Sequence, residues 1–294
     1  MTAPNFARLI LLAFAWGITF LLIRVAAPVL GPVLLVESRV AIAGLVLLTY
    51  ARALGLLPEF RARWRMYLML GALNSALPFV LISYAQLRLE ASFTAVLIST
   101  SPMFSALLGH ALGEDRLSLR KLAGLGAGVA GVAILLGWHP ADTASGNVLP
   151  RTASIVLVLG AALVYAIAAA YTRRQSGKAP GLMLATGSQL GAAALLLPLV
   201  PGTWPNAAPT VEAIACMLVL ALLSSAFAFV LYFRLIADIG PVKTLSVNFI
   251  APLFGVAGGV IALGEPLTAS MVAGAAVILA GTWLALVPGA RPES

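Results

Sequence analysis

Polar side chains recur at helical spacing inside long apolar stretches of this sequence, where they could bind a small solute. The clearest example runs through Ser75, Phe79 and Ser83, with Asn74 beside them; residues three or four apart share one face of a helix. Similar faces occur in four other apolar stretches. The side chains that we predict to contact a substrate are Trp16, Asn74, Ser75, Phe79, Ser83, Ser101, Tyr165, Ser225, Phe229 and Asn248.

Packing is the alternative explanation for these polar faces. Serine and threonine hydrogen bonds also join membrane helices, at about 1 kcal/mol or less each. For any single serine this explanation is the better one. Five such faces in one chain favour a shared, mildly polar cavity.

Two prolines occupy matching positions within apolar stretches. Pro102 and Pro252 each remove a backbone donor and disrupt the helical bond to the carbonyl four residues earlier. A static kink tolerated by packing is one interpretation. We favour the interpretation that both prolines are hinges, because transporters bend and contact their substrates at broken helices near the middle of the bilayer.

Charged groups indicate what the site could bind. All 10 acidic residues lie in loops or within about two turns of the end of an apolar stretch, so the sequence predicts no carboxylate at mid-membrane depth. A neutral site suits an uncharged, aromatic or zwitterionic solute. Arg39 is the deepest basic residue, and the sequence leaves open whether it faces the cavity or extends outward along the lipid.

The sequence predicts no enzyme site, metal site or cofactor site. It contains no HExxH metalloprotease motif and no GxxxxGK phosphate-binding loop. The glycines of residues 126–131 match a dinucleotide-binding pattern, but they lie inside an apolar stretch without a preceding strand. Close packing of helices is the better explanation for that spacing.

Composition indicates an integral membrane protein. Charged residues make up 10% of the 294 residues and hydrophobic residues 61%, and the mean hydropathy is +1.03. A soluble domain usually carries about 25% charged residues. The net charge of +8 does not indicate nucleic-acid binding, because the basic residues form short clusters between apolar stretches.

Ten apolar stretches approach the length of about 20 residues that crosses a bilayer. We predict membrane spans at residues 6–24, 33–51, 66–86, 92–112, 119–137, 151–172, 182–200, 211–236, 242–263 and 269–287. A cytoplasmic N-terminus leaves only Arg24, Arg39, Arg88 and Arg151 of the 18 basic residues outside, as basic loops favour the cytoplasm. Both termini are therefore expected to be cytoplasmic.

The two halves of the sequence resemble each other at a shift of 150 residues. The shift aligns Ser38-Arg39 with Ser188-Gln189, Pro102 with Pro252, and residues 79–81 with 229–231. We therefore predict an all-α membrane protein made of a first five-helix repeat, 1–145, and a second, 146–294. Because five is odd, the second repeat must be inverted in the membrane, an arrangement that opens a central site to either side. Duplication for stability alone is the alternative.

These features resemble the EamA-type branch of the drug/metabolite transporter superfamily. The resemblance rests on Trp16-Gly17, on residues 39–43, and on the paired blocks 102–131 and 252–281. The branch that looks most similar is the YddG-type amino-acid exporters. The second half departs from the pattern, with Val164-Tyr165 in place of Trp-Gly.

The resemblance implies an exporter of amino acids or related metabolites in the bacterial inner membrane, with its site between the halves. Together with the neutral site, it favours amino acids with apolar or aromatic side chains, moved by alternating access. The expected partners are a small-molecule substrate and the lipid bilayer, with no nucleic acid. We expect a monomer, with a dimer as the alternative. Export of drugs or nucleobases is the alternative function within the family, and a membrane-embedded enzyme is the alternative outside it.

Overall fold

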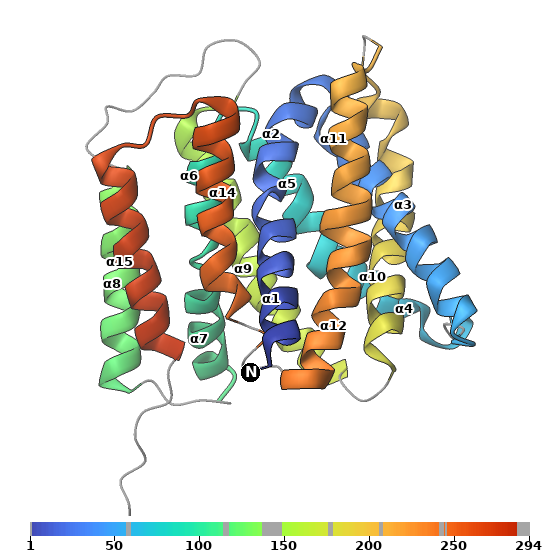
Figure 1. Cartoon of the computed structure of the whole chain (residues 1–294), viewed down its shortest axis with the longest axis horizontal. Helices are drawn as coiled ribbons and strands as arrows, with labels where there is room; N and C mark the ends of the chain where they lie inside the picture. Colours follow the sequence, from blue (N-terminus) through green and yellow to red (C-terminus); the bar gives the residue numbers. More distant parts are fainter. Residues whose placement is uncertain are drawn as a thin grey trace, which may run out of the picture.

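The computed structural model describes residues 2–56, 60–113, 118–136, 149–175, 179–205, 208–240, 244 and 246–286. Within these ranges every regular element is a helix (Figure 1). The all-helical architecture agrees with the apolar composition, because a helix satisfies its backbone hydrogen bonds internally and needs no water to do so.

Most helices run roughly along one direction and pack side by side (Figure 1). Their bounds are α1 Ala3–Gly17, α2 Thr19–Leu30, α3 Pro32–Ala53, α4 Phe60–Gly71, η1 Ala72–Ala76, α5 Leu77–Ala85, α6 Ala91–Ile98, α7 Ser101–Ala111, α8 Leu119–Leu136, α9 Arg151–Gln175, α10 Gly181–Leu196, η2 Leu197–Leu199, η3 Pro201–Thr203, α11 Val211–Ala221, η4 Leu222–Phe227, α12 Ala228–Ile239, α14 Val247–Leu263 and α15 Ala269–Leu286.

Eight helical segments among the described residues are long and apolar enough to cross a membrane. The longest are Val211–Ile239, with 29 residues, and Ala3–Leu30, with 28; two shorter apolar helices follow, Val247–Leu263 and Ala269–Leu284. Each predicted span overlaps one of these segments. The chain is therefore a multi-pass membrane protein.

The outer surface of the bundle is apolar. Leu119, Val211 and Ile261 are more than 80% exposed, and many other leucines, isoleucines and valines are also exposed. Soluble monomers rarely expose so much apolar surface. Lipid chains would cover these side chains without an energetic penalty, so the surface agrees with the membrane assignment.

Close packing of α8 against α15 confirms the interpretation of the glycine pattern. The two helices lie side by side in Figure 1. An added Cβ at Gly131 would lie 3.0 Å from the carbonyl oxygen of Gly274, and one at Gly281 would lie 2.6 Å from that of Gly124. Because no larger side chain fits there, glycine lets the two backbones approach directly.

Two π-helical segments occur 150 residues apart. The first, η1, spans Ala72–Ala76, and the second, η4, spans Leu222–Phe227. Such segments are rare and often lie at functional sites. Each segment carries a serine of the predicted polar faces, Ser75 in η1 and Ser225 in η4, and both serines are fully buried.

The two matched prolines have different structural effects. α6 ends at Ile98 and α7 begins at Ser101, so Pro102 lies at the start of a new helix, and the Ser101 hydroxyl donates to the Ile98 carbonyl oxygen at 2.6 Å. That bond satisfies the carbonyl that Pro102 would otherwise leave without a partner. Pro252, by contrast, lies inside the continuous helix α14.

Candidate functional site

Arg39 lies at the centre of a buried group of predicted site residues. Its side chain extends from α3 and is only 3% exposed, and its Nε donates to the Ser225 hydroxyl on η4 at 2.8 Å. The guanidinium carbon lies 4.0 Å from the centroid of the Phe79 ring, a cation–π contact. Arg39 therefore points into the protein and does not extend outward along the lipid.

A second hydrogen bond repeats this arrangement, with the donor in the second half of the chain and the acceptor in the first. Gln189 on α10 donates from Nε2 to the Ser75 hydroxyl on η1 at 2.9 Å, and both side chains are fully buried. Gln189 aligns with Arg39 at the shift of 150 residues, and Ser75 aligns with Ser225. Each bond joins a residue before position 145 to one after it, so equivalent side chains link the two parts of the chain.

Aromatic and further polar side chains surround these two bonds. Phe79 belongs to a buried cluster with Val36 and Val40, against which Tyr165 packs. Phe79, Tyr165, Ser75 and Ser225 are thus predicted site residues that the structure connects through Arg39, Gln189 or the shared cluster.

Two other predicted residues come from the same polar face as Ser75. Asn74 donates from Nδ2 to the Thr172 hydroxyl on α9 at 3.3 Å. Ser83 is fully buried, and its hydroxyl has no hydrogen-bond partner among the described residues. A buried hydroxyl without a partner costs free energy, so Ser83 is a group that a polar ligand could satisfy.

The remaining predicted residues have other neighbours. Trp16 packs in a separate apolar cluster, where its ring lies 5.5 Å from that of Tyr232. Phe229 stacks on Phe233 at 6.4 Å between ring centroids. Ser101 bonds to the Ile98 carbonyl, as described above, and Asn248 is half-buried on α14. The hydrogen bond and the cation–π contact described for Arg39 involve none of these residues.

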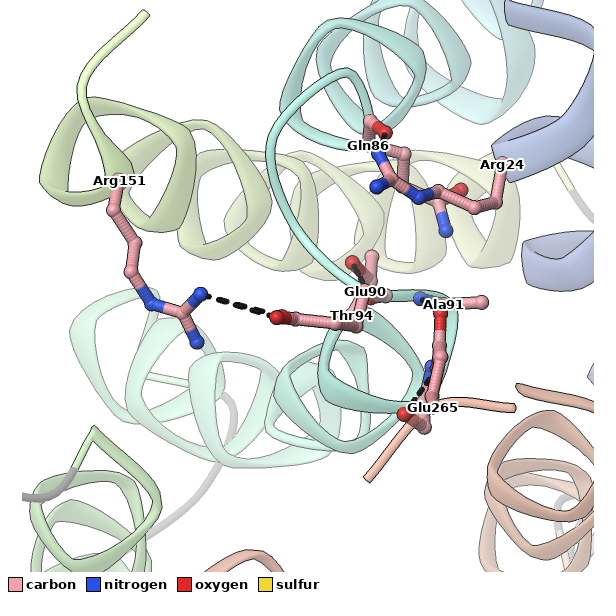
Figure 2. Close-up of polar contacts among 8 residues, drawn as sticks. Arg24, Gln86, Glu90, Ala91, Thr94, Arg151 and Glu265 are labelled. Atoms are coloured by element: carbon pink, nitrogen blue, oxygen red, sulfur yellow. Dashed lines mark hydrogen bonds and ion pairs between the residues drawn. The ribbon is translucent and has the colours of Figure 1, made fainter. Parts of the chain in front are cut away.

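A polar cluster surrounds the start of α6 (Figure 2). The Glu265 carboxylate, from the segment after α14, accepts hydrogen bonds from the backbone N–H of Ala91 at 2.6 Å and of Ser92 at 2.9 Å, and from the Ser92 hydroxyl. Arg151 reaches Glu90 at 3.3 Å. Glu265 thus caps the first turn of α6, where a helix presents unpaired donors.

Arg24 and Gln86 join α2 to the end of α5. The Arg24 guanidinium donates to the Gln86 carbonyl oxygen at 2.6 Å, and the Gln86 side chain donates to the Phe20 carbonyl oxygen at 3.0 Å. Gln86 is fully buried. α2 and the end of α5 are therefore held together beside the capped start of α6 (Figure 2).

A pocket of about 480 Å³ opens elsewhere on the surface. It is lined by Ala62, Arg63, Trp64, Arg65, Met66 and Gln175. None of these is a predicted site residue. The basic lining agrees with an end of the bundle rather than with the apolar interior.

Sequence reasoning missed several of these residues. Gln189 aligns with Arg39 in the internal repeat, and that alignment was the signal that could have identified it. Glu265 belongs to the pair Gly264-Glu265, which repeats Gly113-Glu114 of the first half, but the repeat does not predict its contact with α6, because that contact depends on packing between segments 173 residues apart. The equivalent glutamate, Glu114, lies outside the described residues.

The chain is similar over nearly its whole length to several proteins named as transporters. A "Probable terminal-alkyne amino-acid exporter" of Streptantibioticus cattleyicolor is 26% identical over 94% of this chain and 91% of its own length. The "Uncharacterized transporter YvbV" of Bacillus subtilis is 25% identical over 94% and 90%. The "Uncharacterized inner membrane transporter YedA" of Escherichia coli K12 is 26% identical over 90% and 85%.

A solved structure and a family profile extend the comparison. A protein of known crystal structure is 17% identical, has a TM-score of 0.66 and covers 97% of both chains, which shows a shared fold. The sequence profile of the EamA-like transporter family matches residues 7–137 and again residues 152–287. The chain therefore belongs to the EamA-like transporter family.

Proposed function

We propose that this protein exports small neutral or zwitterionic metabolites across the bacterial inner membrane, with amino acids bearing apolar or aromatic side chains as its favoured substrates. The observation that carries this proposal is the buried pair of cross-linking bonds, Arg39 to Ser225 and Gln189 to Ser75. Polar groups buried inside a membrane protein are costly, and they often mark the path of a substrate. The relative named as an amino-acid exporter supports the same substrate class.

The proposed transport mechanism is alternating access between two inverted five-helix repeats, residues 1–145 and 146–294, around a central cavity. The family profile matches the chain twice, which supports this mechanism. The π-helical segments and the two buried hydrogen bonds also recur at a shift of 150 residues. In this arrangement Pro102 and Pro252 are the hinges. The start of α6, where the Glu265 carboxylate binds, then faces the outside of the cell, and both termini are cytoplasmic.

Reporter fusions test the orientation of the repeats. Fusions after residue 115 and after residue 266 follow the equivalent Gly-Glu pairs of the two repeats. Inverted repeats place the first reporter in the cytoplasm and the second outside. Reporters on the same side of the membrane would contradict the inversion and, with it, alternating access between the halves.

Transport by purified protein in proteoliposomes tests the substrate class. Vesicles loaded with unlabelled L-phenylalanine are expected to accumulate labelled L-phenylalanine by counterflow, with saturation and with competition by other apolar amino acids. Saturable flux of drugs or nucleobases without flux of any amino acid would overturn the substrate assignment. Phe79 and Tyr165 would contact the apolar part of the substrate, and Ser75, Ser83 and Ser225 would hydrogen-bond its polar part, with Trp16, Asn74, Ser101, Phe229 and Asn248 completing the path.

A further inference from the structure

The charge of Arg39 has no counter-ion among the described residues. Its Nη1 is buried without a hydrogen-bond partner, and its Nε bonds to a neutral hydroxyl. Asp238 and Glu90 pair with other arginines, Arg8 and Arg151 respectively. A guanidinium in this state is expensive to bury in a membrane protein.

The two buried carboxylates of the described chain do not neutralise Arg39. Glu37 lies two residues away on α3, and side chains at that separation point to different sides of a helix. Glu265 is occupied by the backbone donors at the start of α6. Neither buried carboxylate of the described residues therefore supplies the counter-charge, and the carboxylate of a bound molecule would supply it.

We propose that Arg39 binds the carboxylate of the transported substrate, and that this carboxylate, rather than an amino group, is the main determinant of recognition. The inference rests on the transport function proposed above. The planar guanidinium matches the two oxygens of a carboxylate and bonds to them more strongly than a neutral donor does. Phe79 beneath the guanidinium and Tyr165, which packs against the same apolar cluster as Phe79, offer apolar surface, so the ligand class is a carboxylate joined to an apolar body.

The first test compares three competitors of L-phenylalanine counterflow on the wild-type protein. 3-Phenylpropionate keeps the carboxylate and lacks the amine, whereas L-phenylalaninamide keeps the amine and lacks the carboxylate. A charge-assisted hydrogen bond of about 1.5–3 kcal/mol corresponds to about 10-fold to 100-fold in affinity. We expect 3-phenylpropionate to compete nearly as well as unlabelled L-phenylalanine, and the amide to compete at least about 10-fold more weakly.

The second test uses Arg39→Gln, which Gln189 makes a well-matched variant. Gln189 already bonds to a serine at the equivalent position, so glutamine at residue 39 is expected to keep the bond to Ser225 and the fold. The variant should lose the preference for acid over amide while still binding the amide. Arg39→Lys keeps the charge without the planar fork and should retain part of the preference. Arg8→Gln, which removes a partly exposed arginine paired with Asp238, is the control and should keep the full preference.

The outcomes separate this inference from the proposed function. Flux of L-phenylalanine with equal competition by acid and amide would overturn the role of Arg39 and leave an amino-acid exporter. An acid preference that survives in Arg39→Gln would also overturn it. If Arg39→Gln fails to fold, the wild-type competition and Arg39→Lys still decide the question. Absence of saturable flux for every amino acid tested would overturn the proposed function itself.

Discussion

Replacing Glu265 by alanine is expected to destabilise the protein through the first turn of α6. The Glu265 carboxylate accepts from the backbone N–H groups of Ala91 and Ser92, and the side chain is only 9% exposed. Alanine leaves both donors without their partner. At a lower bound of about 1.5 kcal/mol for each hydrogen bond to a charged group, the two bonds together predict a loss of about 3 kcal/mol. Glutamine, which keeps one acceptor oxygen, should lose about half as much.

Thermal unfolding of the purified protein in detergent measures this loss. The matched control is Glu212→Ala, because Glu212 lies in the first turn of α11 but is exposed, and its helix already has the Thr210 hydroxyl as a cap. Exposed substitutions of this kind usually change stability by no more than about 0.5 kcal/mol. Equal melting temperatures for the Glu265 and Glu212 variants would refute the assignment of Glu265 as the cap of α6.

The contact between Glu265 and α14 offers an independent check of the same geometry. An added Cβ at Gly259 would lie 2.2 Å from the Glu265 carboxylate, whereas one at Gly258 would make only ordinary contacts of 3.7 Å with Leu21. Gly259→Ala should therefore displace the carboxylate and lower the melting temperature, and Gly258→Ala should not. If the two variants melt together, the carboxylate does not lie against α14 as the structure places it.

Two further predictions concern other parts of the bundle. Gly131→Ala is expected to lower the free energy of unfolding by about 1–3 kcal/mol, because the added methyl group overpacks against the α15 backbone. Gly126→Ala is the control and should be neutral or stabilising, because an added Cβ there meets nothing within 4 Å. Thermal melts of the two variants in detergent compare them. Ser225→Ala removes the acceptor of the charged Arg39 donor and should lower the free energy of unfolding by about 1.5–3 kcal/mol. Ser75→Ala removes the acceptor of the neutral Gln189 donor and should lower it by less. A lower melting temperature for Ser75→Ala than for Ser225→Ala would contradict the charged character of the first bond.

Apolar segments were the part of the fold that sequence reasoning could predict best. Each predicted span overlaps a helix, because the bilayer requires a continuous apolar stretch and this requirement is visible residue by residue. The π-helical segments were not predictable in this way. An extra residue in one turn is stabilised by what its side chains meet, as Ser75 meets Gln189, and that partner lies 114 residues away.

The internal repeat predicted which positions correspond, but not what each position does. Pro102 and Pro252 correspond in sequence, yet Pro102 begins a new helix and Pro252 lies within a continuous one. At the first position the Ser101 hydroxyl donates to the Ile98 carbonyl oxygen, which the proline leaves without its backbone donor. Neighbouring side chains thus decide whether a proline breaks a helix.

Arg39 and Gln189 differ in a more consequential way. Both donate to a serine on a π-helical segment, so equivalent position predicts the same contact. Only the arginine carries a charge, and a glutamine would have been sufficient for the hydrogen bond alone, as its counterpart demonstrates. Packing therefore explains the amide at one position. At the other, the guanidinium contacts the Phe79 ring, but its Nη1 is buried without a hydrogen-bond partner, and this unsatisfied charged group is the reason for the proposed contact with the substrate carboxylate.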